Sequence, residues 1–130
     1  GTTRAHIARA VVESIAYQVR DVIDTMVSAS ATPITDLRVD GGASVMDLLC
    51  QFQADQLDAT VNRPVDQETT ALGAAFLAGL AEGVWASTDA IGDAWTLDAS
   101  FSPAADRSAA DAGHADWLRA VDRSRGWATS

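Results

Sequence analysis

The segment LRVDGGAS, residues 37–44, combines residue types that favour the binding of a phosphate group around the pair Gly41-Gly42. A short strand over Leu37–Val39 is predicted to stop at this glycine pair and to lead into a helix that Ser44 caps. The amides of a first helical turn lack partners, the helix dipole is positive there, and glycine has no Cβ to obstruct an anion. A turn in which the glycines serve geometry alone fits the same segment, so both interpretations stay open. The chain contains neither G-x-x-x-x-G-K-[ST] nor G-x-G-x-x-G, which excludes a P-loop and a dinucleotide fingerprint.

Other side chains with reactive groups are assigned structural roles. Asp40 is expected to hydrogen-bond within its own turn, Glu13 to form a salt bridge or a cap, and His6 to pack or to cap near a helix start. Cys50 is predicted to be an inert core thiol because no histidine lies near it in sequence, and His114 falls in a polar stretch that supports no assignment. We predict no catalytic residue and no metal ligand, since one cysteine and two histidines form no cluster with zinc-ligand spacing.

Alternating helix and strand patterns surround the glycine pair and predict an α/β fold with helices packed on a small sheet. The predicted elements are a helix over 4–27 capped by Thr2 or Thr3, a strand over 37–39, a helix from Ser44 to Leu57 or Asp58, a strand over 59–63 and a helix over 68–84. Beyond Trp85 we predict a turn of helix over 87–92, an irregular stretch containing Pro103 and a polar helix over 110–126.

Apolar spacing predicts which side of each helix is buried. The first helix should bury a side made of Ile7, Val11, Ile15, Val19, Val22 and Met26. It should expose to solvent a side that carries Arg9, Glu13, Arg20, Asp21 and Asp24. The second helix should bury Val45, Leu48, Leu49 and Phe52, and the last should dock through Trp117, Leu118, Val121 and Trp127. The third helix is rich in glycine and alanine, which indicates tight helix packing.

Two strands are too few for an independent sheet, so further strands are expected upstream of Gly1. The chain opens without Met on a helical pattern, which we interpret as the cut end of a longer protein. Strands left without neighbours would expose unpaired amides and apolar surface. We therefore expect the lobe to be truncated on its N-terminal side and the isolated chain to form a homo-oligomer.

Charge and hydropathy exclude several partner classes. The 130 residues carry 18 acids against nine bases, all arginine, for a net charge of −9, so nucleic acid and anionic membrane surfaces are poor partners. The longest apolar run, residues 71–81, is too short for a bilayer that requires about 20 residues. The single cysteine suits a reducing compartment, and we predict a cytoplasmic protein.

Ordered segments of the chain resemble the FGGY family of carbohydrate kinases. HIARAVVE, from His6 to Glu13, resembles the second half of that family's C-terminal signature, and LRVDGGAS resembles the adenosine motif of the actin-like ATPase superfamily. LLCQFQAD, NRP and ETTALGAAFLAGLAEGVW are, in that order and spacing, most similar to the family members that phosphorylate glycerol. The likeness covers almost the whole chain and weakens beyond Trp95.

The resemblance implies a two-domain kinase with ribonuclease-H-like lobes, which transfers a phosphoryl group from ATP, with Mg²⁺, to a terminal hydroxyl of glycerol. Residues 1–94 would be the distal part of the nucleotide-side C-terminal lobe, and residues 95–130 a peripheral helical tail. The family's catalytic Asp, glycerol-binding residues and Mg²⁺ ligands belong to the part absent here, so the isolated chain is expected to be inactive. A pentulose kinase of the same family and a non-catalytic actin-like assembly module stay open as alternatives.

The resemblance also assigns three binding residues. Gly42 would contact the nucleotide phosphates through its backbone, Gly41 would permit that approach, and Met46 would face the nucleoside. Family members commonly have Asn where this chain has Met46; Met cannot supply the hydrogen bonds of an amide, although its thioether can pack against a base. Met46 also falls in line with Cys50 at four-residue spacing, so a core position is the alternative.

Overall fold

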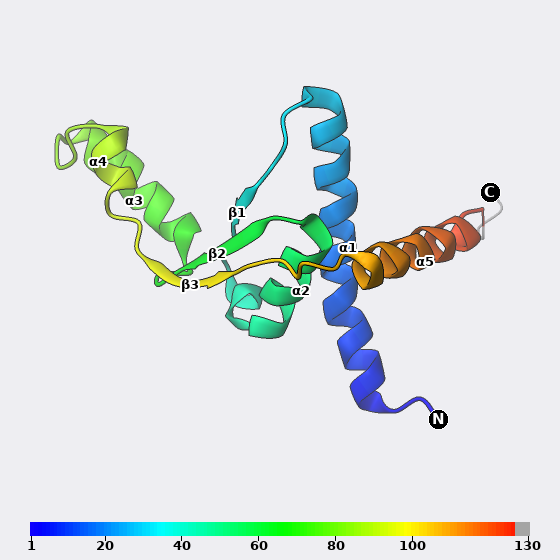
Figure 1. Ribbon diagram of the computed structural model, residues 1–130. Coiled ribbons are helices and arrows are strands. Elements are labelled where there is room, and N and C mark those ends of the chain that lie inside the picture. The colour runs from blue at the N-terminus through cyan, green and yellow to red at the C-terminus, as the bar shows by residue number, and fades with distance from the viewer. Residues whose placement is uncertain (127–130) are drawn as a thin grey trace.

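The computed structural model describes residues 1–126 as helices arranged around a small mixed sheet (Figure 1). Its elements in chain order are α1 (Arg4–Ser30), β1 (Asp36–Arg38), a 3₁₀ turn η1 (Gly42–Val45), α2 (Asp47–Leu57), β2 (Thr60–Pro64), α3 (Thr69–Ala81), α4 (Thr88–Gly92), β3 (Leu97–Phe101) and α5 (Ser108–Ser124). The prediction of an α/β fold with helices on a small sheet is confirmed.

The sheet has the strand order β1-β2-β3. β1 pairs in parallel with β2, with Leu37 opposite Val61, and β2 pairs antiparallel with β3, with Val61 opposite Phe101. The prediction of an irregular stretch in this region is wrong, because residues 97–101 form β3. Its sequence LDASF does alternate apolar and polar residues, as a strand does, but Pro103 close behind it favours an irregular stretch. β3 lies just beyond the division proposed at residue 94 and shares a sheet with residues before it.

The buried core lies between α2 and the sheet. Cys50 and Ala54 of α2 and Val61 of β2 are almost fully buried, and partly buried Leu37, Val39 and Phe101 pack against them. Helix α2 also contacts α1 on its other side, so that it lies between α1 and the strands. The core therefore fixes α2, and the turn before it, against β1 and β2.

Helix α1 begins at Arg4 as predicted, where the Thr3 N–H donates to Nδ1 of His6 over 3.1 Å. The predicted buried and exposed sides of α1 are wrong for the described residues. Ile7, Val11 and Val22 are 60%, 59% and 58% exposed, whereas the buried side of the helix centres on Ala16. The reason is that α2 and α5 meet the side of this helix that carries Ala16 and several polar residues.

The predicted start of the second helix is also wrong. Residues Gly42–Val45 form η1, so α2 begins only at Asp47, and Ser44 does not cap it. The Ser44 hydroxyl instead donates to the Gly41 carbonyl over 2.7 Å. Because the helix starts later, Leu48 and Val45 are half exposed, and the residues buried along α2 are Leu49, Cys50, Gln53, Ala54 and Gln56.

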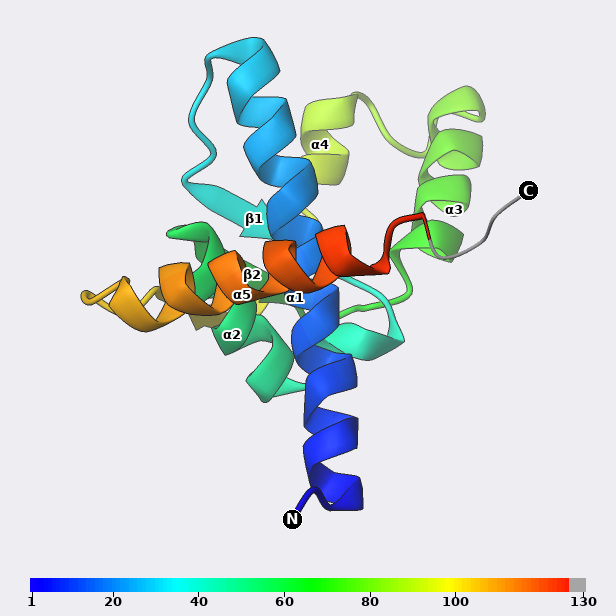
Figure 2. The same cartoon turned by 90° about the vertical axis from the view of Figure 1, so that its right-hand side faces the viewer.

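Helices α3 and α4 lie at the end of the sheet away from α1 and α5 (Figure 1). The predicted tight helix packing of α3 is wrong for the described residues, since no residue of α3 is buried and Gly73 has open space around it. At Gly79 an added Cβ would lie 2.6 Å from Cδ1 of Trp85, but this side chain follows the same helix. Helix α5 crosses α1 (Figure 2) and docks through Trp117, while Leu118 is half exposed and Trp127 lies outside the described residues.

Candidate functional site

The turn after β1 has a geometry that requires glycine at its first position. Gly41 has φ +78° and ψ 171°, a conformation that other residues adopt only with strain. Its N–H donates to the Gln67 carbonyl over 3.0 Å, and its carbonyl accepts from the Ser44 N–H over 3.0 Å. The turn is thus held on one side by the loop before α3 and on the other by η1.

Gly42 presents unobstructed main chain to solvent. It is exposed, and a Cβ built on it would meet nothing within 4 Å. Among residues 1–126, neither its N–H nor that of Ala43 donates a hydrogen bond to another residue, as expected for the first amides of η1. Two adjacent free amides with open space before them fit an anionic oxygen such as a phosphate oxygen.

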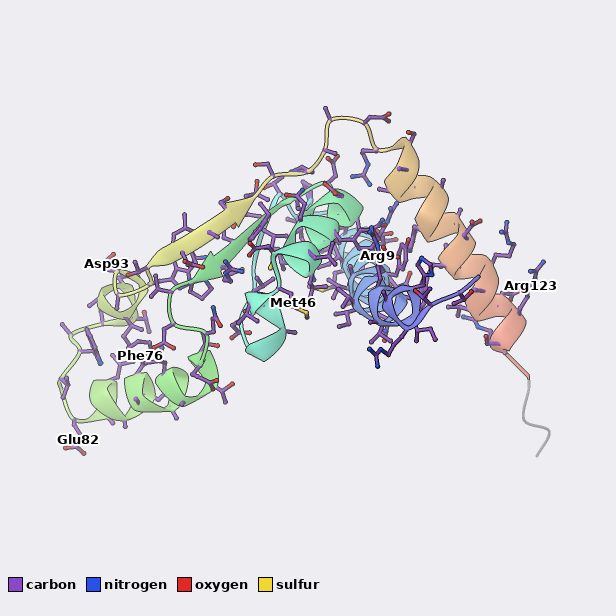
Figure 3. All side chains as sticks on the ribbon, turned by 90° about the horizontal axis from the view of Figure 1, so that it is seen from below. Arg9, Met46, Phe76, Glu82, Asp93 and Arg123 are labelled. Carbon is purple, nitrogen blue, oxygen red and sulfur yellow. The ribbon has the colours of Figure 1, made fainter. Side chains whose placement is uncertain are left out.

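Met46 occupies the N-cap position of α2. It has extended backbone angles, φ −84° and ψ 104°, and its carbonyl accepts from the N–H groups of Leu49 and Cys50 over 2.9 and 3.1 Å. Its side chain gives the helix no capping hydrogen bond and is half buried. Figure 3 shows Met46 beside η1, on the same connection as the glycine pair. The structure therefore places Gly41, Gly42 and Met46 in one short connection, with Met46 at the edge of the core.

A cavity of the described residues lies elsewhere. It has a volume of about 460 Å³ and opens between the end of β2, helices α3 and α4, and the residues just before β3. Phe76 and Trp95 line it, and the Arg38 guanidinium lies 4.4 Å from the centroid of the Trp95 ring. None of the three predicted binding residues lines this cavity. Sequence reasoning missed it because its walls come from elements that meet only in the fold.

The polar junction of α1 and α5 was also missed. His114 is only 8% exposed, and its Nε2 lies 2.8 Å from Oδ1 of Asp21. The Trp117 indole N–H donates to Oδ2 of the same carboxylate over 2.8 Å, and Tyr17 stacks on both rings. Burial raises the pKa of Asp21, but the hydrogen bonds from Trp117 and His114 outweigh it and hold that pKa below its usual value. The junction attaches α5 to α1.

The remaining sequence candidates take structural positions. Cys50 is buried, its thiol donates to the Ser44 carbonyl over 3.3 Å, and burial raises its pKa, which confirms an inert core thiol. Glu13 accepts from Arg9 over 2.6 Å and His6 caps α1, as predicted. Asp40 is exposed and its carboxylate makes no hydrogen bond to residues 1–126, so the predicted bond to its own turn does not form.

Residues 1–126 contain no group of three or more His, Cys, Asp or Glu side chains that could hold a metal ion. None of their helices is both long and apolar enough to span a bilayer.

The likeness to solved kinase structures gives the class of fold, part of an actin-like ATPase lobe. Glycerol kinase from Plasmodium falciparum, solved with ADP, matches with a TM-score of 0.79 and 32% identity over 96% of this chain and 26% of that one. Xylulose kinase from Rhodospirillum rubrum has the same fold, with a TM-score of 0.76 at 19% identity over 95% of this chain.

The sequence comparisons then give the family. The chain belongs to the FGGY family of carbohydrate kinases, whose C-terminal domain matches residues 1–82. Glycerol kinase 2 of Thermotoga maritima is 53% identical over 127 residues, which are 98% of this chain and 26% of the relative. The chain thus spans about a quarter of the length of the curated relatives that it matches.

Proposed function

We propose that this chain is the distal C-terminal part of an ATP-dependent glycerol kinase and forms the adenosine and phosphate side of its nucleotide cleft. The observation that carries the proposal is the open main chain at Gly42, at the end of a parallel strand, in a chain 53% identical to a glycerol kinase. Ligands in α/β folds bind beyond the carboxyl ends of parallel strands, which is where this turn lies.

In this proposal the free amides of Gly42 and Ala43 donate to phosphate oxygens of the nucleotide. Gly41 holds the conformation that directs them outward, and Met46 packs against the nucleoside. Phosphoryl transfer also requires a base for the acceptor hydroxyl, and Mg²⁺ supplies charge neutralisation of the phosphates when it is bound. The described residues contain no cluster that fits the metal, so we propose that its ligands, the base and the glycerol-binding groups belong to the rest of the polypeptide.

The complete protein tests the proposal when it is assayed with ATP and a panel of glycerol and pentuloses. We expect phosphorylation of glycerol at a kcat/KM at least about tenfold above that of any pentulose, which corresponds to about 1.4 kcal/mol in transition-state binding. A preference for a pentulose would change the proposed substrate from glycerol to a pentulose, and the protein would still be proposed as a carbohydrate kinase. Self-association without nucleotide binding would favour a non-catalytic assembly module.

The chain of residues 1–130 by itself is expected to have no kinase activity. It carries a candidate for phosphate binding but no assigned base or metal site, and positioning alone does not complete the transfer. The measurement is ATP-dependent formation of glycerol phosphate by the purified chain, with the complete protein as positive control. Turnover by the purified chain would place the catalytic groups within residues 1–130 and would contradict this assignment.

Replacing Met46 by asparagine is expected to tighten ADP binding about fivefold, which corresponds to about 1 kcal/mol for one added hydrogen bond. Asparagine is also a good N-cap, so the same change would stabilise α2. Met46→Ser is the matched control, because serine can cap the helix but is shorter. Calorimetric titration of both variants separates the two effects; equal ADP affinity in Met46→Asn and wild type would assign Met46 to the edge of the core.

We also propose that the protein is cytoplasmic and assembles as a homo-oligomer. Ile7, Val11 and Val22 of α1 are each more than half exposed. Such an apolar surface supports the proposal that another subunit covers this helix in the assembly. Light scattering of the complete protein measures its oligomeric state.

A further inference from the structure

Arg63 of β2 connects the turn before α2 to helix α2 and to strand β3. Its side chain is only 12% exposed. Nη1 donates to the Ser44 carbonyl over 3.0 Å and to Oδ1 of Asp47 over 2.8 Å, while Nε donates to Oδ2 of Asp98 over 2.7 Å. The guanidinium also lies 5.5 Å from the centroid of the Phe101 ring. One side chain therefore contacts η1, the first turn of α2 and strand β3.

The Ser44 carbonyl lies inside η1 and, among residues 1–126, has one donor besides Arg63. That donor is the weak thiol of Cys50 at 3.3 Å. Arg63 is suited to this position because its planar guanidinium donates in fixed directions from separate nitrogens, whereas the three donors of a lysine ammonium all leave from one nitrogen. The position of η1 relative to the strands thus depends on Arg63.

We propose that Arg63 is a positioning residue for nucleotide binding, which holds η1 so that the amides of Gly42 and Ala43 and the start of α2 keep their places. The inference rests on the proposed function, because it assumes that this turn contacts the nucleotide. Arg63 itself lies behind the turn, on β2, and touches the turn through the Ser44 carbonyl. Its loss leaves that carbonyl and the Asp47 carboxylate without their strongest donor.

Arg20 provides a matched control at a different place in the fold. It is 13% exposed, and it donates to Gln56 over 3.1 Å and to Asp111 over 2.9 Å at the junction of α1, α2 and α5. Its burial and number of strong partners are close to those of Arg63, but none of its partners lies in η1. A purely structural role of Arg63 would make the two arginines equivalent in nucleotide binding.

The experiment uses the complete protein and three variants, Arg63→Met, Arg63→Lys and Arg20→Met. ADP is titrated calorimetrically, KM values are measured for ATP and glycerol, and thermal midpoints report stability. We expect Arg63→Met to raise the Kd of ADP about tenfold with the KM of glycerol within twofold of wild type. We expect the Kd of ADP for Arg63→Lys to lie between those of wild type and Arg63→Met, because an ammonium donates from one nitrogen and matches the spread of the acceptors less well. We expect Arg20→Met to lower the thermal midpoint while the Kd of ADP stays within twofold.

Equal Kd values for ADP in Arg63→Met and Arg20→Met would overturn the inference, as would a parallel loss of glycerol and ADP binding. If Arg63→Met does not fold, Asp98→Ala replaces it: Asp98 is 42% exposed on β3, and its removal frees Nε and loosens the guanidinium. That variant is expected to raise the Kd of ADP about threefold, and an unchanged Kd would overturn the inference. Wild-type protein that binds no ADP would instead refute the proposed function.

Discussion

Replacing Gly42 by valine is expected to raise the KM of ATP about tenfold or more while the KM of glycerol changes less than about twofold. The fold has room for the side chain, since a Cβ at Gly42 would meet nothing within 4 Å and the residue has no positive φ. The branched side chain would occupy the space in front of the amides of Gly42 and Ala43 and keep phosphate oxygens out. A tenfold effect corresponds to about 1.4 kcal/mol of lost binding.

Steady-state kinetics of the complete protein checks this result, and Gly73→Val is the matched control. Gly73 likewise has nothing within 4 Å of an added Cβ, but it lies on α3. The control should therefore show the cost of valine for glycine without the loss of ATP affinity. Equal increases in the KM values of ATP and glycerol for Gly42→Val would indicate general distortion of the fold. An unchanged KM for ATP would show that the phosphates do not bind at this turn.

Replacing Asp21 by alanine is expected to lower the free energy of opening of α5 by about 2 kcal/mol. The carboxylate accepts from the Trp117 indole and contacts the His114 ring, both over 2.8 Å, and its removal leaves these groups without their acceptor. Native-state hydrogen exchange of α5 amides measures the opening, and protection should fall about 30-fold. Asp24→Ala is the control, because Asp24 is 58% exposed and lies 3.6 Å from Arg20.

The same junction predicts a dependence on pH. The pKa of Asp21 is lowered in the folded protein, so its carboxylate contributes stability above the usual aspartate range and loses that contribution as the pH falls through the folded pKa. Protection of α5 in the wild type should therefore decrease relative to that in Asp21→Ala from about pH 5 downward. A constant difference between the two proteins across this range would show that the junction does not depend on the charge of Asp21.

Local sequence patterns predicted the connection that carries the candidate site. Glycine favours the positive φ that Gly41 adopts, and strand propensity indicated the strand before the glycine pair. The lack of a second cysteine or a nearby histidine indicated that the Cys50 thiol is buried and inert. The family resemblance was confirmed, because the family's C-terminal domain matches residues 1–82, which contain its motifs apart from the last three residues of the final one.

Long-range contacts were not predictable in this way. Periodicity identified α1 as an amphipathic helix but assigned the wrong side to its contacts, because a helix pattern does not say which elements are available to cover it. His114 received no role from sequence, although it meets Asp21 across 93 positions of the chain. The strand β3 was missed because its pairing with β2 depends on a partner 38 residues upstream in the case of Asn62 beside Ser100.

Short-range patterns in the sequence predicted the α/β class, the glycine turn and the family, since each depends on residues close together in the chain. Contacts between distant segments required the fold: the junction of Asp21 with His114 and Trp117, the pairing of β3 with β2, and the hydrogen bond from Arg63 to the Ser44 carbonyl. The physical reason is that a hydrogen bond between distant residues forms only after the core has fixed both partners. Its geometry is therefore a consequence of the whole fold and not of any one segment.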